Sequence, residues 1–194
     1  MDLSDQRDVE TDVYQPAEDS QLLAETACER INDEHTGPTT VLEVGTGSGY
    51  VAARVAAETD ARVIASDVNP HAVSQASGDA VEAVRADLVS PFAAEAFDAV
   101  LFNPPYLPTD PENEWDDWME RALSGGEDGR AVIDPFLGSV DRVLAPKGVV
   151  YLLASSLTGV EAVVERAGEE GFSAVAVADE SFPFETLTVL KLLR

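Results

Sequence analysis

An asparagine, two prolines and a tyrosine close an apolar run in VLFNPPYLP, at Asn103-Pro104-Pro105-Tyr106. Two consecutive prolines end a strand, so the Asn103 amide is expected at a strand end. Its side-chain oxygen can accept a hydrogen bond from an NH2 group, and the Pro104 carbonyl can accept a second. Together they can grip a planar amide or amine against the Tyr106 ring and aim its nitrogen at a group to be transferred. Taken alone, the tetrapeptide also fits an ordinary proline-rich turn.

A glycine-rich turn follows the first apolar run of the chain. Gly45, Gly47 and Gly49 stand at alternate positions, which lets a backbone turn tightly and approach a ligand closely. In the dinucleotide fingerprint the third glycine, counted from Gly45, would fall at Tyr50, which does not fit. Counted from Gly47 it falls at Ala52, which the relaxed form allows. The glycines alone therefore leave a nicotinamide cofactor open.

Three acids end successive predicted strands. Glu43 enters the glycine turn, Asp67 can accept bonds from two ribose hydroxyls, and Asp87 can accept from an adenine amine. A pyrophosphate would be repelled by these carboxylates, whereas S-adenosylmethionine carries a sulfonium and an ammonium. The acids therefore favour S-adenosylmethionine as the cofactor, although each acid taken singly would be read as a solvated surface residue.

Strands and helices alternate along the chain. The predicted strands span residues 41–44, 62–67, 81–87, 97–103, 149–155, 173–180 and 186–193, and the predicted helices 16–31, 49–58, 70–78, 133–144 and 160–170. This order predicts an α/β fold with helices on both faces of a seven-stranded, mostly parallel sheet. The last two strands should pair antiparallel, and the polar strand 81–87 should be an edge. Ligands of such sheets bind at the carboxyl ends of the strands, at the switch point.

The charge of the chain is strongly negative. Asp and Glu number 37 against 12 Lys and Arg, which gives a net charge of −25. Such a surface repels a nucleic-acid backbone, so direct nucleic-acid binding is not expected. We interpret the charge as adaptation to a salt-rich cytoplasm, as in a halophilic archaeon. In such salt the screening is severe, and charge alone does not exclude nucleic acid.

Other features limit the class of protein. Cys28 is the only cysteine, which excludes a disulfide within the chain and a cysteine-based zinc site. His35 and His71 lie far apart and are interpreted as structural or surface residues, so no metal is expected. No segment has the length and apolarity of a membrane span or a secretion signal. The sequence predicts one cytoplasmic domain over residues 1–194, with a flexible segment at 1–12.

The motifs resemble those of the HemK-like group of class I S-adenosylmethionine-dependent methyltransferases, and specifically its short archaeal and eukaryotic branch. That branch methylates the glutamine of the GGQ motif in class 1 translation termination factors. The matching segments cover most of the chain: VYQPAEDS (13–20), LEVGTGSG (42–49), DVNP (67–70), DL (87–88), NPPY (103–106), Gly125-Gly126 with Gly129-Arg130, and ETLTVLKL (185–192).

The resemblance assigns roles to individual positions. It implies Asp19, Ser20, Glu43 and Gly45 at the methionine end of the cofactor, Asp67 at the ribose, and Asp87 with Leu88 at the adenine. The complete set of expected cofactor contacts is Asp19, Ser20, Glu43, Gly45, Gly47, Gly49, Asp67, Asp87, Leu88 and Asn103. The expected substrate contacts are Tyr14, Asn103, Pro104, Pro105 and Tyr106, of which Asn103, Pro104 and Tyr106 are the expected catalytic residues.

The resemblance also implies a partner, a small zinc-binding activator subunit that adds strands to the sheet edge. The segment 81–87 is the candidate edge for such β-augmentation, and the isolated chain should be poorly soluble or inactive. Bacterial HemK-like enzymes have a separate N-terminal helical domain that docks the release factor. That domain is not expected here, so docking must use the catalytic face, the partner, or both.

Several alternatives stay open. The same active site can serve an adenine-N6 methyltransferase of nucleic acid, a protein lysine methyltransferase, or a non-catalytic scaffold that keeps the fold. The segment 107–123 is interpreted as a loop, in which Trp115 and Trp118 either close over a substrate or pack at the surface. Arg130 is expected to bind a carboxylate locally and is given no catalytic role.

Overall fold

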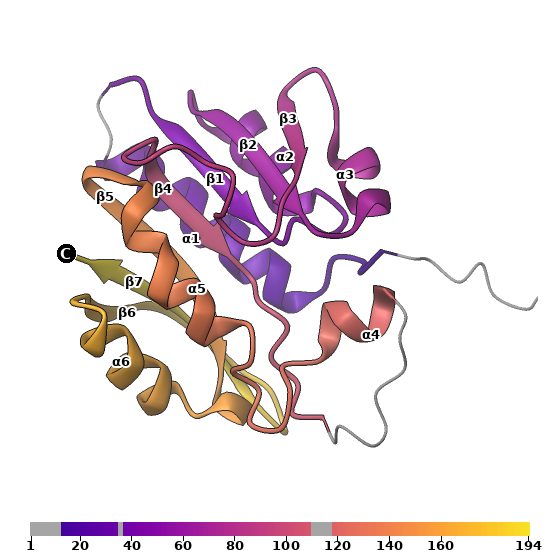
Figure 1. Cartoon of the computed structure of the whole chain (residues 1–194), viewed down its shortest axis with the longest axis vertical. Coiled ribbons are helices and arrows are strands. Elements are labelled where there is room, and N and C mark those ends of the chain that lie inside the picture. The colour runs from indigo at the N-terminus through magenta and orange to yellow at the C-terminus, as the bar shows by residue number, and fades with distance from the viewer. Residues whose placement is uncertain (1–12, 35–36, 110–117) are drawn as a thin grey trace, which may run out of the picture.

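The structure is a computed structural model that describes residues 13–34, 37–109 and 118–194. At its centre lies a seven-stranded sheet with the strand order β3-β2-β1-β4-β5-β7-β6 (Figure 1). The strands are β1 Thr40–Val44, β2 Arg62–Asp67, β3 Val81–Arg85, β4 Phe97–Phe102, β5 Leu144–Ser155, β6 Ser173–Ser181 and β7 Thr186–Leu193. The helices are α1 Glu18–Glu34, α2 Tyr50–Glu58, α3 Pro70–Ala76, α4 Trp118–Leu123, α5 Ile133–Val140 and α6 Val160–Glu169, with 3-10 turns η2 Asp141–Val143 and η3 Ser156–Thr158.

The directions of the strands confirm the predicted fold class. The neighbours from β3 through β2, β1 and β4 to β5 pair in parallel, and β7 pairs antiparallel with both β5 and β6. The reversed strand is therefore β7, which enters between β5 and β6. The predicted edge position of β3 is also confirmed.

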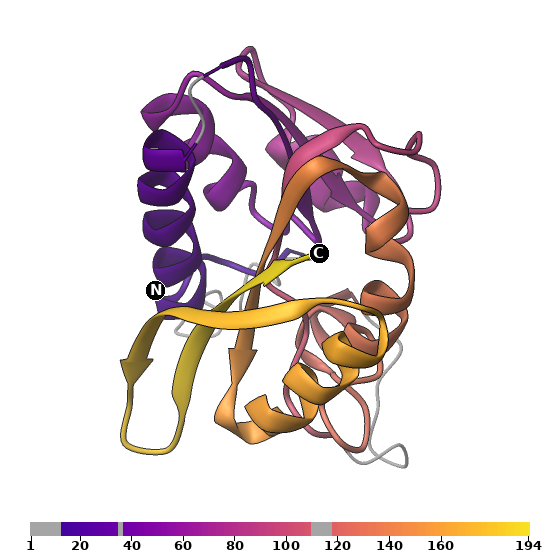
Figure 2. The same cartoon turned by 90° about the vertical axis from the view of Figure 1, so that its left-hand side faces the viewer.

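Alternation of side chains along the strands divides the core between the two faces of the sheet. Leu42, Val100 and Leu152 belong to a cluster on the face covered by α5 and α6. Val41 and Leu101 belong to the cluster on the opposite face, which α1 and α2 cover. Figure 2 shows α1 on one side of the sheet and α5 with α6 on the other. Because both faces are covered, the central strands are apolar at nearly every position, as parallel strands require.

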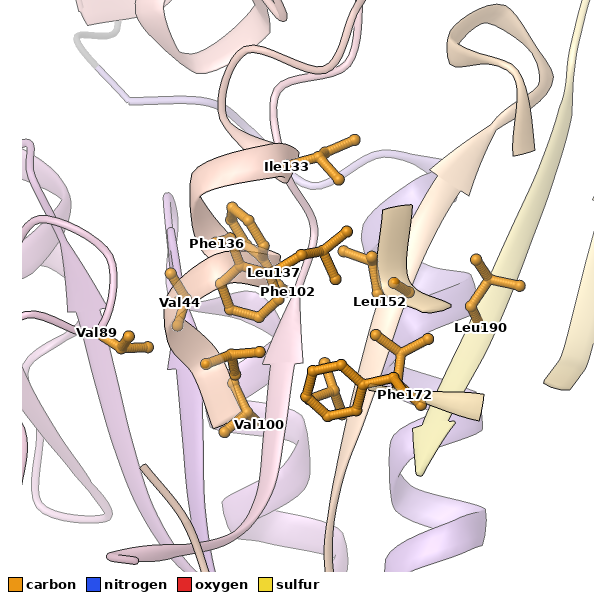
Figure 3. Packing of buried hydrophobic residues seen from close by; sticks show 14 of the residues in the cluster. Val44, Val89, Val100, Phe102, Ile133, Phe136, Leu137, Leu152, Phe172 and Leu190 are labelled. Atoms are coloured by element: carbon orange, nitrogen blue, oxygen red, sulfur yellow. The ribbon is translucent and has the colours of Figure 1, made fainter. Parts of the chain in front are cut away.

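The end of β4 is anchored by aromatic packing. Phe102, the last residue of β4, packs its ring against Phe136 of α5 with 4.5 Å between ring centroids and 51° between planes. Figure 3 shows both rings between α5 and the sheet, with Leu137 and Leu152 beside them. Burying one such side chain stabilises the fold by roughly 1.5–3 kcal/mol. The residue that follows Phe102 is Asn103, so this packing fixes where the NPPY segment leaves the sheet.

The start of α3 follows from its local sequence. Asn69 is the N-cap residue, and its side-chain oxygen accepts a hydrogen bond from the N–H of His71 at 2.9 Å. Pro70 occupies the first helical position, where its missing N–H costs nothing. This cap places the helix directly after β2 and beside the strand's last residue, Asp67.

Two boundaries differ from the sequence prediction by more than three residues. The predicted helix 133–144 ends at Val140 and continues as η2, and β5 begins at Leu144 rather than at residue 149. Pro146 and Gly148 carry the usual sequence signal for the end of a helix, but they lie in an irregular part of β5 where the pairing with β4 shifts register. A Cβ at Gly148 would lie 2.9 Å from the backbone oxygen of Phe97, so only glycine fits this close approach.

Two further expectations need correction. The strand predicted at 81–87 ends at Arg85, so Asp87 lies in the turn that follows. The segment 107–123, interpreted as a loop, contains the helix α4. A helix of six residues is too short to show an apolar period, which is why the pattern did not predict it. Trp118 is the first residue of α4.

Some expectations fall outside the described residues, namely the flexible segment at 1–12 and those for His35 and Trp115. Within the described part of the chain, no helix has the length and apolarity needed to cross a membrane. In the same part, no group of three or more His, Cys, Asp or Glu residues is arranged to hold a metal ion.

Candidate active site

The switch point of the sheet lies between β1 and β4. The chain proceeds from β1 outward through β2 to β3 and then returns to β4 on the other side, so the turns after β1 and β4 separate there. A cavity of about 910 Å³ opens at the carboxyl ends of these strands. Its lining includes these sequence-predicted residues: Tyr14, Asp19, Ser20, Glu43, Gly45, Gly47, Asp67, Asp87, Leu88, Asn103, Pro104, Pro105 and Tyr106. This is where ligands bind in open α/β sheets.

The first two glycines of the turn after β1 have positive φ and face the cavity. Gly45 has φ of +64°, and a Cβ there would lie 3.2 Å from the Phe102 ring. Gly47 has φ of +52° and donates its N–H to Oδ2 of Asp67 at 2.9 Å. The turn is therefore shaped by glycine's conformational freedom and tied to the end of β2.

Gly49 is predicted as a cofactor contact, but it does not line the cavity. Its φ is +82°, and a Cβ there would lie 2.8 Å from the Cα of Ala76 in α3. Glycine at this position lets α2 begin close against α3. Gly49 therefore serves the packing of α2 against α3, and the cavity lining does not support its predicted contact with a ligand.

Glu43 is buried at the base of the glycine turn. Its Oε2 accepts hydrogen bonds from Oγ1 of Thr46 at 2.5 Å and from the N–H of Ala52 at 3.0 Å. Burial raises the pKa of the Glu43 carboxyl to about 8, which these two bonds only partly offset, and the nearby charge of Asp67 raises it further. Glu43 thus holds the turn against the start of α2 and presents a weakly acidic carboxyl to the cavity.

Asp67 is oriented by the backbone on both sides. In addition to Gly47, the N–H of Asn69 donates to Oδ1 of Asp67 at 2.8 Å. Burial raises the pKa of the Asp67 carboxyl, while the bonds from Asn69, Gly47 and Val68 oppose that rise. The backbone oxygen of Asp67 also accepts from the N–H of Ala86 at 2.9 Å, which joins the ends of β2 and β3.

The turn after β3 forms the far end of the cavity. Asp87 is exposed and Leu88 is half-buried. Leu88 has φ of +48°, which is uncommon for a residue other than glycine. The turn therefore keeps Leu88 in a strained conformation at a position that lines the cavity, and such strain is concentrated at functional sites.

The segment ahead of α1 folds over the glycine turn. The hydroxyl of Tyr14 donates to Oδ2 of Asp19 at 3.0 Å, and the N–H of Ser20 donates to Oδ1 of Asp19 at 2.5 Å. The Tyr14 backbone oxygen would lie 3.6 Å from a Cβ on Gly47. Burial and the Asp19 charge raise the pKa of the Tyr14 hydroxyl, so Tyr14 stays protonated as a donor.

The NPPY segment meets the cavity from the β4 side. Pro104 is buried, and Tyr106 is half-buried with a phenol pKa raised by burial and by the charges of Asp19 and Glu185. The Oδ1 atom of Asn103 is buried and has no hydrogen-bond partner among the described residues. A buried acceptor without a partner is costly, and such atoms are rare unless a ligand completes them.

Sequence reasoning missed parts of the lining that come from distant segments. Phe182 and Glu185 reach the cavity from the turn between β6 and β7, and Arg121 reaches it from α4. Trp118, for which the sequence left open a place over a substrate or packing at the surface, also lines the cavity. For Phe182 the only local indication is that aromatic residues occur between the predicted strands 173–180 and 186–193. Nothing local in the sequence shows that this hairpin returns to the active site.

Known proteins share this arrangement. Residues 41–125 match the family model described as a methyltransferase domain. The chain is 34% identical to a predicted protein N5-glutamine methyltransferase of Methanocaldococcus jannaschii over 94% of this chain and 92% of that protein. It is also 34% identical to the human methyltransferase HEMK2, over 95% of this chain and 91% of that protein. The sheet order, the cavity at its switch point and these matches define a class I S-adenosylmethionine-dependent methyltransferase.

The relatives identify the family within that class. Among solved structures, the E. cuniculi Mtq2–Trm112 complex, responsible for methylation of the eRF1 termination factor, matches with a TM-score of 0.76. Its identity to this chain is 28%, over 95% of this chain and 99% of that one. With two relatives above 30% identity over nearly the whole length, the chain belongs to the HemK-like family of protein N5-glutamine methyltransferases.

The lining chemistry suits the cofactor of this class. Its acidic residues are Glu18, Asp19, Glu43, Asp67, Asp87 and Glu185, and Arg121 is the one cation among the described side chains of the lining. S-adenosylmethionine, when bound, supplies a methyl group on a positively charged sulfur, and it also carries an ammonium group. Carboxylates in a partly desolvated cavity attract such charges more strongly than they would in water.

Proposed function

We propose that this chain is the catalytic subunit that methylates the side-chain nitrogen of the glutamine in the GGQ motif of a class 1 release factor. One observation carries the proposal: the Oδ1 atom of Asn103 at the switch point is buried and has no hydrogen-bond partner in the described part of the chain. A primary amide presents two N–H donors, and its nitrogen is the atom to be methylated. The Asn103 oxygen is placed to complete its own hydrogen bonding with one of those donors.

Asn103 and Pro104 are the proposed grip on the glutamine side chain. Oδ1 of Asn103 accepts one N–H, and the backbone oxygen of Pro104 accepts the other. The two bonds fix the plane of the amide and hold its nitrogen in line for transfer. The entropy cost of bringing the reactants together is then met when the substrate binds, and it no longer adds to the barrier of the transfer step. The ring of Tyr106 covers the flat face of the amide.

The same two acceptors serve the charge that develops at nitrogen. As the nitrogen gains a methyl group it becomes more positive, so its N–H groups become stronger donors to Asn103 and Pro104. The methyl group replaces one amide hydrogen, which leaves as a proton. A protonated amide is a strong acid, so water can take that proton and no lining residue with a lowered pKa is needed.

The charge of the lining favours a protein substrate over nucleic acid. An adenine amine is as planar as a glutamine amide, so the grip alone does not separate the two classes. A nucleic acid would bring phosphates toward Glu18 and Glu185, which line the cavity near Tyr14 and Tyr106. Phosphate recognition needs several Lys or Arg side chains, which this lining does not supply.

The exposed edge of β3 is the proposed docking place of a small activator subunit, which we expect to bind zinc. Within the described chain β3 pairs with β2 alone, and Val81 is the only buried residue of this strand. Val84 on β3 and Val68 beside it expose 39% and 44% of their surface, which is high for valine. A strand added by a partner would pair with this edge and cover these side chains. We place the complex in the cytoplasm, where translation terminates.

Mass spectrometry of the reaction products tests the substrate assignment. The chain, its activator, the release factor and isotope-labelled S-adenosylmethionine are mixed in high KCl. The label is expected on the GGQ glutamine and should disappear when that glutamine is changed to alanine. RNA, DNA and a lysine-containing histone tail are offered in parallel. Label on any of these, with none on the release factor, would reject the proposed substrate.

A further inference from the structure

A short loop beside the NPPY segment has no assigned role, although its sequence is unusual. We call residues 103–109 the catalytic loop and residues 124–130, SGGEDGR, the buttress loop. The two are joined by a small parallel bridge between Leu107 and Ser124. The N–H of Gly125 donates to the oxygen of Leu107 at 2.9 Å, and the N–H of Thr109 donates to the oxygen of Gly126 at 2.9 Å.

Side chains extend this junction. The hydroxyls of Thr109 and Ser124 share a hydrogen bond of 2.5 Å. The N–H of Leu107 donates to the oxygen of Leu123 at 3.0 Å, which ties the catalytic loop to the end of α4. The backbone that follows Tyr106 is therefore held at two residues, Leu107 and Thr109, although the loop itself has no regular secondary structure.

Gly129 of the buttress loop packs tightly against the catalytic loop. It is buried, and its φ is +76°. A Cβ at this position would lie 2.6 Å from the backbone oxygen of Tyr106 and 2.6 Å from Cγ2 of Thr158. Any side chain at residue 129 would have to displace the carbonyl group of Tyr106 or the turn that contains Thr158. Gly129 thus sits between the catalytic loop and η3 with no spare room.

Arg130 fixes the buttress loop to η3, the turn that follows β5. Its guanidinium donates from Nη1 to the oxygen of Thr158 at 2.7 Å and from Nη2 to Oδ2 of Asp128 at 2.6 Å. Thr158 in turn donates its hydroxyl to the oxygen of Ser155 at 2.7 Å. The Ser155 hydroxyl donates to Glu185, which lines the cavity from the β6–β7 turn.

We infer that the buttress loop positions the catalytic loop, with Gly129 as the residue that sets the location of Tyr106 and, through the chain, of Pro104 and Asn103. Gly129 and Arg130 are positioning residues, since neither lines the cavity. They act by holding the two acceptor oxygens of the grip where a planar amide must lie. The inference depends on the proposed function only for the reaction used to measure it.

Gly129→Ala tests this role against a matched control. Gly171→Ala places alanine at an equally unfavourable φ of +88°, but nothing lies within 4 Å of the new Cβ. Both variants carry similar backbone strain, and only the first pushes on Tyr106. With the activator present, the single-turnover methylation rate of Gly129→Ala is expected to fall about tenfold or more, since small displacements of reacting groups cost that much.

Two quantities separate positioning from a general loss of structure. The affinity for S-adenosylmethionine, measured by calorimetry, should be similar in both variants because all its predicted contacts except Asn103 lie outside the catalytic loop. Thermal melts of Gly129→Ala and Gly171→Ala should show both variants folded at the assay temperature. A rate for Gly129→Ala equal to that of Gly171→Ala, or a rate and an affinity that fall together with the folded fraction, would overturn the inference.

Hydrogen exchange tests the same role without any substrate. The amide of Thr109 is bonded to Gly126 in the buttress loop, and the amide of Leu107 is bonded to Leu123 just before that loop. Their exchange should therefore accelerate in Gly129→Ala and remain at the wild-type rate in Gly171→Ala. An unchanged exchange rate would contradict the inference. A wild-type enzyme that leaves the release factor unmethylated would reject the proposed function instead, and this exchange measurement would still decide the buttress.

Arg130→Gln covers the case in which Gly129→Ala does not fold. Glutamine keeps an N–H donor for the Thr158 oxygen but loses the fork to Asp128, so the loop is loosened rather than pushed aside. The turnover rate should fall less than in Gly129→Ala, with the cofactor affinity again unchanged. Arg130→Lys retains the charge and should recover part of the rate. No loss of rate in Arg130→Gln would count against the buttress.

Discussion

Gly47 donates its backbone N–H to Oδ2 of Asp67 over 2.9 Å, and so joins the glycine turn after β1 to the end of β2. The Asn69 N–H holds the other oxygen of the same carboxylate. The carboxylate is therefore oriented by the backbone before any ligand arrives. Groups held in this way bind a ligand with little further loss of conformational entropy.

Asp67→Asn should weaken the binding of S-adenosylmethionine by roughly tenfold, the equivalent of one hydrogen bond to a charged acceptor. Asparagine has an NH2 group in place of one carboxylate oxygen, and this donor would face the backbone N–H of Gly47 or of Asn69. Asp98→Asn is the matched control. Oδ2 of Asp98 also accepts a hydrogen bond from a backbone N–H, that of Thr40 at 2.8 Å, but it lies at the amino ends of β1 and β4, away from the cavity. Calorimetry should find wild-type affinity in the control, and wild-type affinity in Asp67→Asn would contradict the assigned role.

Glu43 should give the free protein a distinctive pH dependence. Burial raises its pKa from 4.5 to about 8, so between these values the folded chain keeps a proton that the unfolded chain has released. The free energy of unfolding therefore falls as pH rises through this window, by at most about 1.4 kcal/mol per pH unit. Glu43→Gln cannot titrate and should lack this component.

Urea unfolding at several pH values measures this effect. The stability difference between the wild type and Glu43→Gln should change steadily in favour of the variant from pH 5 to pH 8, in high KCl throughout. The two proteins share every other titrating group, so their difference isolates Glu43. Parallel stability curves would show that this carboxyl is ionised in the folded protein across the whole range.

Much of this site is encoded locally in the sequence. The strands alternate or are wholly apolar, and short strand-to-helix turns follow them, so the ends of β1, β2 and β4 were predicted within one residue. The prediction that Asn103 and Asp67 lie at the same end of the sheet therefore follows from the parallel topology. The predicted lining contained one exception, Gly49, because a glycine that faces a ligand and one that faces Ala76 look alike in sequence.

The remaining features depend on tertiary contacts that no local pattern encodes. Glu185 reaches the cavity only because β7 enters the sheet between β5 and β6. Gly129 has its role because it meets the oxygen of Tyr106, which is distant in the sequence. Pro146 and Gly148 carry the usual signal for the end of a helix, but the pairing of β5 with β4 overrides it.

Val84→Asp should prevent stable association with the activator. Val84 exposes 39% of its surface on the open edge of β3, and a charge there would be buried without a partner in the complex. Val175→Asp is the control, because Val175 is 51% exposed on β6 at the opposite edge of the sheet. Co-purification should lose the activator only in Val84→Asp. Equal loss in both variants, or in neither, would argue against β3 as the interface.

The acidic surface should make folding dependent on salt. With a net charge of −25, the folded chain repels itself in dilute buffer, and counterions reduce this repulsion. We propose that the chain is adapted to a salt-rich cytoplasm. Circular dichroism melts should show a midpoint that rises steadily as KCl increases from dilute to molar concentrations. A melt that ignores KCl would contradict that adaptation.

The acceptor role of Asn103 is the central claim, and a two-variant series tests it most directly. Asn103→Asp keeps an acceptor oxygen in place, whereas Asn103→Ala removes it. Single-turnover methylation of the release factor, mapped to the GGQ glutamine, should fall by roughly 100-fold or more in Asn103→Ala at saturating S-adenosylmethionine, where a weaker cofactor contact does not limit the rate. Asn103→Asp should retain clearly more activity than Asn103→Ala. Equal activity in the two variants, or an alanine variant as fast as the wild type, would contradict the account.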